Sequence, residues 1–179
     1  MERSIPFNQP CLAGKELEYV RQAVDLGKLA GDGEFARRCA ALLEERFQIA
    51  KVVLTNSCTA ALEMAALLCD LAPGDEVLLP SFTFVSTANA VVRCGATPVF
   101  VDIRPDTLNL DESLLESLVS PHTRAIFPVH YAGIGCAMDA IAEFAAQREL
   151  IVVEDAAQAV HASWEGRALG SFGHLAAFS

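Results

Sequence analysis

The 179-residue sequence has no long uninterrupted apolar run, although 53% of its residues are hydrophobic. Its richest apolar segment, residues 58–72, is interrupted by Glu63 and Asp70. The N-terminal residues, which include Glu2 and Arg3, lack the continuous apolar core of a signal peptide. A helix that spans a bilayer needs about 20 predominantly apolar residues. We therefore expect no membrane association and a cytoplasmic location.

Basic residues and paired cysteines are also scarce. Lys and Arg number 13 against 23 Asp and Glu, which gives a formal net charge of −10. Nucleic-acid affinity depends on clustered basic side chains that neutralise phosphates, so nucleic acid is not an expected partner. The six cysteines form no C-x-x-C pair, which favours reduced thiols over a disulfide framework or a metal site. Cys39 and Cys69 are interpreted as core residues.

The chain alternates between helical and strand-like patterns. Helical periodicity is present in residues 15–26, 34–47, 59–71, 83–94, 111–118 and 138–149. Apolar runs predict strands at residues 52–55, 76–79, 98–101, 125–129 and 150–153. Such repetition indicates parallel strands joined by right-handed helical crossovers. The expected fold is a three-layer α/β/α domain with a mainly parallel sheet.

Two strand ends carry groups that could bind a phosphorylated, flat ligand. Residues 55–62 pass from a strand into a helix, so first-turn amides and the Ser57 and Thr59 hydroxyls could bind an anion. Taken alone, the same residues are more typical of a plain helix cap. Phe82 and Phe84 follow the next strand, where one ring could stack on a ligand or fill the core.

Two further strand ends carry polar side chains. The apolar run 150–153 leads to Asp155 and Gln158, and open α/β sheets bind ligands beyond the carboxyl ends of their strands. The alternative role for Asp155 is the cap of a short helix. His130 and Tyr131 follow residues 125–129 and could contact substrate, but a lone histidine is more often structural. We assign His130 no catalytic role.

A dinucleotide-binding fold is the competing interpretation of this region. Gly133-Ile134-Gly135 follows a strand, precedes a helix and lies about 20 residues before Asp155. The third glycine position is occupied by Met138, whose side chain obstructs the close approach of helix and strand. A nicotinamide dinucleotide also leaves Asp155 and the aromatic pair without a clear role.

Together, the strand ends match a planar, phosphorylated heteroaromatic cofactor. Amides would hold a phosphate, an aromatic ring would stack on the cofactor, and a carboxylate would keep a pyridine nitrogen protonated. Pyridoxal 5'-phosphate has all of these features, so we predict it as the cofactor.

Eight segments, in order, resemble the DegT/StrS family of sugar-nucleotide aminotransferases, which are fold-type I pyridoxal-phosphate enzymes. The matching segments are residues 5–8, 27–33, 57–60, 74–77, 80–87, 128–133, 154–158 and 178–179. The resemblance implies that residues 1–179 form the N-terminal portion of the cofactor-binding large domain. The rest of that domain and a small C-terminal domain would then be absent. It also implies a homodimer for the full-length protein.

The resemblance implies cofactor contacts for seven residues. They are Ser57, Cys58, Thr59, Phe84, Asp155, Gln158 and Ser179. The first three would hold the phosphate through amides and hydroxyls, and the last would add a hydroxyl. Phe84, rather than Phe82, would stack on the ring, Asp155 would pair with the pyridine nitrogen, and Gln158 would lie near the phenolic oxygen. Residues 27–33 would shape the sugar-nucleotide site.

The implied reaction moves an amino group from L-glutamate to C4 of a dTDP-4-keto-6-deoxyhexose, giving a dTDP-4-amino-4,6-dideoxyhexose for cell-surface polysaccharide synthesis. The family's Schiff-base lysine lies in a Ser-Phe-His-x-x-Lys motif, of which only Ser179 is present. Lys15, Lys28 and Lys51 occupy none of that motif. We therefore assign no catalytic residue and predict that residues 1–179 are inactive alone.

Two alternatives remain open at this point. One is a non-catalytic module that binds pyridoxal phosphate or a sugar nucleotide. The other is a pyridoxal-phosphate-dependent sugar dehydratase, in which histidine replaces the lysine of the same motif.

Overall fold

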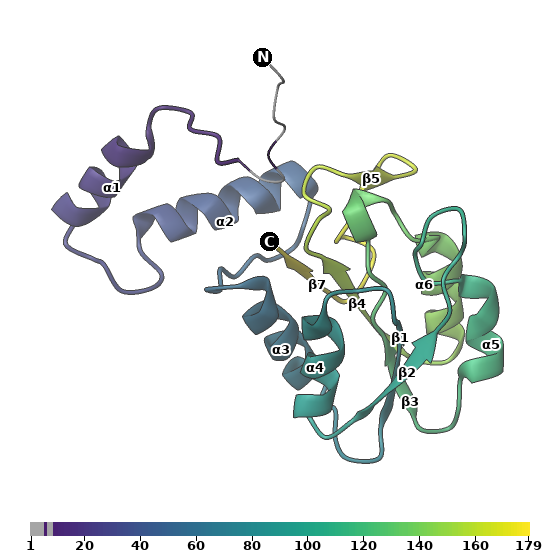
Figure 1. Ribbon diagram of the computed structural model, residues 1–179. Coiled ribbons are helices and arrows are strands. Elements are labelled where there is room, and N and C mark those ends of the chain that lie inside the picture. The colour runs from purple at the N-terminus through teal and green to yellow at the C-terminus, as the bar shows by residue number, and fades with distance from the viewer. Residues whose placement is uncertain (1–5, 7–8) are drawn as a thin grey trace. The chain divides into compact units, whose positions relative to one another are not determined.

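The computed structural model describes residue 6 and residues 9–179 (Figure 1). Most of the family-like segment at residues 5–8 therefore lies outside the described residues. The chain divides into two compact units. The first contains residues 1–46 and 50–54, and the second contains residues 47–49 and 55–179.

The first unit contains helix α1 (Glu16–Asp25) and most of helix α2 (Glu34–Phe47), as the periodicity predicts. Helix α1 begins where the amides of Ala13 and Gly14 donate to the carboxylate of Glu16. The two helices contact each other through Tyr19 and Phe35, whose ring centroids are 5.4 Å apart.

The second unit is organised around a parallel sheet with the strand order β2-β1-β3-β4-β7. The strands are β1 (Glu76–Pro80), β2 (Thr97–Val101), β3 (Thr123–Ile126), β4 (Ile151–Ala156) and β7 (Leu175–Phe178). Val77, Leu78 and Leu79 of β1 are fully buried although they alternate between the two faces. A sheet covered on both faces requires such continuous apolar strands.

Helices cover both faces of the sheet (Figure 1). Helices α3 (Cys58–Leu68) and α4 (Val85–Arg93) lie on one face, and α5 (Leu115–Leu118) and α6 (Met138–Gln147) lie on the other. Val77 belongs to the core cluster that contains Leu62 of α3, whereas Leu78 belongs to the cluster that contains Ile141 of α6. The predicted three-layer α/β/α architecture is confirmed.

The predicted strand at residues 52–55 is wrong. Val53 is exposed over 67% of its surface, and this segment pairs with none of the described strands. The amide of Val52 donates instead to the carboxylate of Glu44 over 2.9 Å. Apolar composition alone does not make a strand where no neighbouring strand offers a hydrogen-bond ladder.

Three short strands were not predicted. They are β7 and the antiparallel hairpin of β5 (Ser163–Trp164) and β6 (Arg167–Ala168). The predicted helix at residues 111–118 is a 3₁₀ turn, Glu112–Leu114, followed by α5, and Asp111 caps it by accepting from the Ser113 amide. Of the two cysteines expected in the core, Cys69 is buried but Cys39 is exposed. Among the described residues, every helix is too short or too polar to cross a bilayer.

Candidate functional site

A pocket of about 640 Å³ lies where β1, β4 and β7 end. Its lining residues are Asn56, Ser57, Cys58, Thr59, Leu62, Thr83, Phe84, Ser86, Tyr131, Asp155, Ala157, Gln158 and Ser179. All seven residues that the sequence proposed as cofactor contacts are among them. The structure therefore brings together side chains from segments that are far apart in the chain.

The N-terminus of α3 forms one wall of the pocket. Ser57 is its N-cap residue, and the Ser57 hydroxyl accepts a hydrogen bond from the Ala60 amide over 3.1 Å. Within the described part of the chain, the amides of Cys58 and Thr59 have no acceptor. Ser57 is thus a helix cap, as the simpler interpretation held, and two free amides remain at the positive end of the helix dipole. These groups can bind an anion.

The hydroxyl of Thr59 contacts a second helix. Thr59 Oγ1 and Ser86 Oγ are 2.7 Å apart, and Ser86 lies in the first turn of α4. This hydrogen bond joins the N-terminal turns of α3 and α4 at the pocket wall. Ser86 lies in the family-like segment at residues 80–87, but no local pattern in the sequence indicated that it would contact Thr59.

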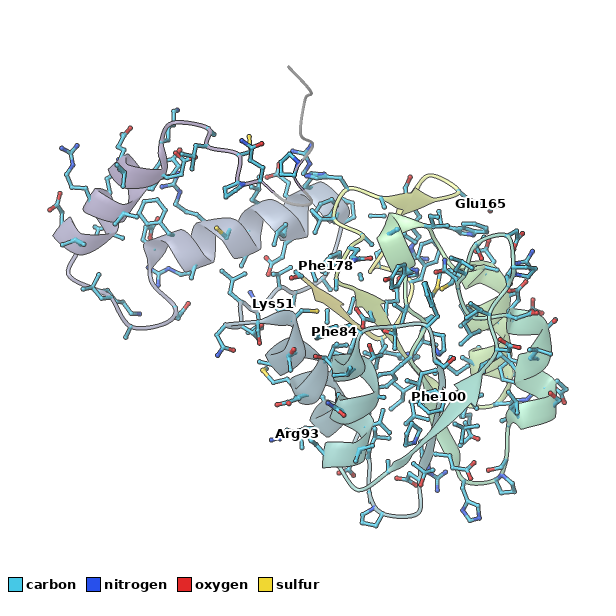
Figure 2. All side chains as sticks on the ribbon, viewed as in Figure 1. Lys51, Phe84, Arg93, Phe100, Glu165 and Phe178 are labelled. Atoms are coloured by element: carbon cyan, nitrogen blue, oxygen red, sulfur yellow. The ribbon has the colours of Figure 1, made fainter. Side chains whose placement is uncertain are left out.

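The two phenylalanines after β1 have different environments. Phe84 is the N-cap residue of α4, and 72% of its surface is exposed at the pocket (Figure 2). Phe82 does not line the pocket and packs instead on Tyr131, with ring centroids 4.5 Å apart. Phe84 is therefore the ring available for stacking on a ligand.

Asp155 supplies a buried carboxylate to the pocket. It lies in β4 and is only 5% exposed. Its Oδ2 accepts a hydrogen bond from Thr87 Oγ1 over 2.7 Å, and its Oδ1 accepts from the Ala157 amide over 3.2 Å. Turns follow β4 directly, so Asp155 does not cap a helix. Each carboxylate oxygen keeps capacity for another hydrogen bond.

Gln158 is oriented by the loop after β3. Its Oε1 accepts a hydrogen bond from the Ala132 amide over 2.7 Å. Ala132 has a left-handed backbone conformation, with φ of 54°. This hydrogen bond holds the side-chain oxygen of Gln158 toward Ala132. The side-chain amide nitrogen of Gln158 is then the group that can donate to a ligand.

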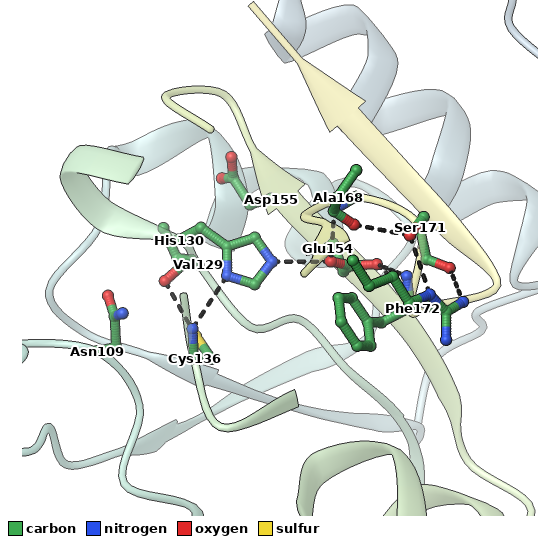
Figure 3. Close-up of polar contacts among 12 residues, drawn as sticks. Asn109, Val129, His130, Cys136, Glu154, Asp155, Ala168, Ser171 and Phe172 are labelled. Carbon is green, nitrogen blue, oxygen red and sulfur yellow. Dashed lines mark hydrogen bonds and ion pairs between the residues drawn. The ribbon is translucent and has the colours of Figure 1, made fainter. Parts of the chain in front are cut away.

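Glu154, next to Asp155, forms a separate buried network (Figure 3). The two side chains point away from each other, as consecutive residues of a strand do. Glu154 accepts hydrogen bonds from His130 Nε2 and from three amides of the loop before β7, those of Gly170, Phe172 and Gly173. It therefore holds that loop against β4.

The protonation of this network follows from its geometry. His130 Nδ1 accepts from the Cys136 amide over 3.2 Å, so Nε2 is the ring nitrogen that donates to Glu154. Burial alone would raise the pKa of Glu154, but hydrogen bonds from His130 and from the Gly173 and Gly170 amides hold the pKa below its usual value. His130 has a structural role here, and a charged residue inside an apolar strand was the sequence signal for such a network.

Cys58 contributes a neutral thiol to the pocket. Burial, together with the negative charge of Asp155, raises the pKa of its thiol to about 11. A thiol with this pKa stays protonated at neutral pH and is a poor nucleophile. Cys58 therefore offers its amide and shape rather than covalent chemistry.

The fold and the pocket define an α/β domain with a pocket beyond the carboxyl ends of its parallel strands. The family model for the DegT/DnrJ/EryC1/StrS aminotransferase family matches residues 10–179. This chain belongs to that family, as the ordered sequence segments indicated. Solved structures of its members confirm the expected fold class, the fold-type I transferase architecture.

Individual relatives are similar over nearly the whole chain. GDP-perosamine synthase of Caulobacter vibrioides is 42% identical over 170 residues, which cover 95% of this chain and 46% of that protein. The spore coat polysaccharide biosynthesis protein SpsC of Bacillus subtilis is 40% identical, with 98% and 45% covered. The chain thus spans about half the length of the curated relatives it matches.

A solved structure connects the family to the predicted cofactor. The Spr1654 protein of Streptococcus pneumoniae in its PLP form has a TM-score of 0.90 and 30% identity, covering 99% of this chain and 49% of that one. The prediction of pyridoxal phosphate is thereby confirmed at the level of the family.

Proposed function

We propose that this chain supplies the cofactor pocket of a pyridoxal-phosphate-dependent sugar-nucleotide aminotransferase. One observation carries the proposal: the buried carboxylate of Asp155 and the free amides at the start of α3 line the same pocket. A small ligand that is only negative would be repelled by the carboxylate of Asp155. One that is only positive would be disfavoured at the N-terminus of α3. Together, the two groups suit a ligand that has a phosphate at one end and a protonated nitrogen at the other.

The residues present fit that cofactor. The amides of Cys58 and Thr59 and the hydroxyls of Ser57 and Thr59 would hold the phosphate, and Ser179 would add a hydroxyl from the end of β7. These groups donate hydrogen bonds, as a phosphate oxygen requires. The acceptor at the opposite end would be Asp155.

Three side chains would act on the cofactor ring. Phe84 would lie against its face, because its ring is exposed at the pocket. Asp155 would accept a hydrogen bond from the ring nitrogen and favour its protonated form. Gln158 would donate from its amide nitrogen to the phenolic oxygen. When bound, pyridoxal phosphate supplies an electron sink for amino-group transfer.

The proposed substrates are L-glutamate and a dTDP-4-keto-6-deoxyhexose, with a dTDP-4-amino-4,6-dideoxyhexose as product. The protein would act in polysaccharide biosynthesis as a cytoplasmic homodimer. The name of the Bacillus subtilis relative supports a polysaccharide pathway. The name of the Caulobacter vibrioides relative, GDP-perosamine synthase, favours a GDP-linked sugar as the second candidate substrate.

Cofactor binding can be tested without the Schiff-base lysine. Pyridoxamine 5'-phosphate has an amine in place of the aldehyde, so it needs no lysine in order to bind. We expect residues 1–179 to bind it in a fluorescence titration. Asp155→Asn should weaken the binding about tenfold or more, because hydrogen bonds to charged groups contribute roughly 1.5–3 kcal/mol. Asp102→Asn is the control, because Asp102 does not line the pocket.

Activity provides the second test. We expect the full-length protein to aminate the keto sugar with glutamate, and comparing the dTDP-linked and GDP-linked substrates identifies the nucleotide. Residues 1–179 alone should show no sustained amination, because the three lysines match no part of the catalytic motif. Sustained turnover by this chain would contradict that assignment. Dehydration in place of amination would favour the dehydratase alternative, and binding without either reaction would favour the non-catalytic module.

A further inference from the structure

The first turn of α4 contacts two of the proposed cofactor-binding side chains through consecutive residues. Ser86 Oγ lies 2.7 Å from Thr59 Oγ1, at the phosphate end of the proposed site. Thr87 Oγ1 lies 2.7 Å from Asp155 Oδ2, at the ring-nitrogen end. Both α4 residues are buried, Ser86 at 7% and Thr87 at 0% exposure.

The direction of hydrogen bonding at Thr87 is set by its partners. An ionised carboxylate can only accept, so Thr87 donates its single hydroxyl proton to Asp155. The Phe84 carbonyl oxygen, 3.2 Å from Thr87 Oγ1, is the weaker competitor for that proton. Thr83 Oγ1 is 2.7 Å from Thr87 Oγ1 and must therefore be the donor to it. The resulting series of hydrogen bonds runs from Thr83 through Thr87 to Asp155.

These hydrogen bonds restrict the rotation of the Asp155 carboxylate. Thr87 holds Oδ2 of Asp155, and the Ala157 amide holds Oδ1. With both oxygens bonded, the carboxylate cannot rotate without breaking a hydrogen bond. Its remaining lone pairs keep one orientation toward the pocket.

The direction of the hydrogen bond between the Thr59 and Ser86 hydroxyls, at the phosphate end, can be assigned by the same reasoning. Either oxygen of Thr59 and Ser86 could be the donor. A phosphate oxygen only accepts, so a bound phosphate would select the arrangement in which Ser86 donates to Thr59 and Thr59 donates to the phosphate. Ser86 would thus direct the Thr59 proton toward the ligand.

We propose that Ser86 and Thr87 are positioning residues that set the two ends of the cofactor site from one helical turn. Ser86 acts through Thr59 on the phosphate, and Thr87 acts through Asp155 on the ring nitrogen. This inference rests on the proposed function of the pocket. Two consecutive residues of one turn cannot move independently, so α4 fixes the spacing between the phosphate-binding hydroxyl and the carboxylate.

The test separates the two ends with two probes. Pyridoxamine 5'-phosphate and pyridoxamine differ only in the phosphate, and each is titrated against residues 1–179 by fluorescence. Ser86→Ala should weaken binding of the phosphorylated probe about three- to tenfold and leave pyridoxamine binding unchanged, because one hydrogen bond contributes about 0.5–1.5 kcal/mol. Thr87→Val should weaken both probes by a similar factor.

A second readout distinguishes positioning from simple loss of structure. Thr87→Val should shift the pH at which the ring nitrogen of bound pyridoxamine 5'-phosphate titrates, as followed by absorbance, whereas Ser86→Ala should not. Thr87→Ser restores the hydroxyl and should return both affinity and titration toward those of the unmodified chain. Thermal unfolding of each variant checks that it is folded.

The outcomes are distinct. Suppose that the unmodified chain binds the phosphorylated probe, and that Ser86→Ala and Thr87→Val bind it with the same affinity. That result overturns the positioning roles and leaves the proposed function standing. Equal weakening of both probes by Ser86→Ala, or an unchanged ring titration in Thr87→Val, also overturns the corresponding role. Failure of the unmodified chain to bind either probe overturns the proposed function and this inference with it.

Discussion

His130 donates a hydrogen bond from Nε2 to Oε2 of Glu154 over 2.8 Å, and both side chains are fully buried. Glu154 also accepts from three amides in the loop that leads to β7. A buried carboxylate is tolerated only when its hydrogen bonds are satisfied. This pair therefore holds β4 and the approach to Ser179 together, while Asp155 faces the pocket.

Glu154→Gln should lower the free energy of unfolding by about 3 kcal/mol. The amide cannot satisfy all of the N–H donors that surround the carboxylate, because its nitrogen would face a donor. Urea unfolding at neutral pH measures the loss. Glu165→Gln on the exposed hairpin turn is the matched control and should change stability by less than about 0.5 kcal/mol (Figure 2). Equal effects of the two substitutions would contradict the buried network.

The stabilisation from Glu154 should depend on pH. Because its hydrogen bonds hold the folded-state pKa below the usual value, the unfolded chain binds the proton more readily. The stabilisation is therefore complete above the ordinary glutamate pKa of about 4.3, and it is lost as pH falls through the lower folded-state value. The stability difference between the unmodified chain and Glu154→Gln should shrink between neutral pH and about pH 3.5. A difference that does not vary with pH would exclude this origin.

Cys58 should react slowly with alkylating reagents although it lines an open pocket. Its pKa of about 11 leaves little thiolate at neutral pH. Relative to an unperturbed thiol of pKa about 8.5, we expect roughly a hundredfold slower alkylation, with a rate that keeps rising above pH 9. Peptide mass spectrometry after timed iodoacetamide treatment measures this, with the exposed Cys11 and Cys39 as internal controls. Alkylation of Cys58 as fast as that of these two residues would contradict the raised pKa.

Phe84→Ala should impair cofactor binding without affecting the fold. Its ring is 72% exposed, so its removal should change the free energy of unfolding by less than about 0.5 kcal/mol. Loss of an aromatic stacking contact should weaken pyridoxamine 5'-phosphate binding by about 0.5–1.5 kcal/mol. Phe100→Ala is the matched control, because Phe100 is 52% exposed on β2 and does not line the pocket (Figure 2). Equal affinities of the two variants would refute the stacking role.

Gly170→Ala should be more damaging than Gly166→Ala. Both glycines have a φ of 83°, so alanine at either position adopts a left-handed conformation that costs about 1–2 kcal/mol. A Cβ at Gly166 would meet no atom within 4 Å, whereas a Cβ at Gly170 would overlap the Phe178 ring. We expect an additional loss of about 1–3 kcal/mol for Gly170→Ala. It should also weaken pyridoxamine 5'-phosphate binding, because Phe178 precedes Ser179. Equal stabilities would show that Phe178 moves freely.

Local sequence pattern was informative where a feature depends on neighbours in the chain. The apolar, β-branched run before Asp155 predicted a strand, and Ser57 before a helical segment predicted a cap. Both interpretations agree with β4 and α3. The same kind of pattern misled at residues 52–55, because a strand also needs a partner and none is paired with this segment.

The sequence by itself determined the layered α/β fold, because apolar periodicity and cap residues are local properties of the chain. Its ordered motifs carried the family resemblance, and that resemblance implied the seven cofactor contacts. Only the tertiary structure decided that Thr87 bonds to Asp155, 68 residues away, and that Ser86 bonds to Thr59. Such hydrogen bonds depend on how the helices pack on the sheet, because a buried hydroxyl bonds to whichever partner the fold places within about 3 Å of it.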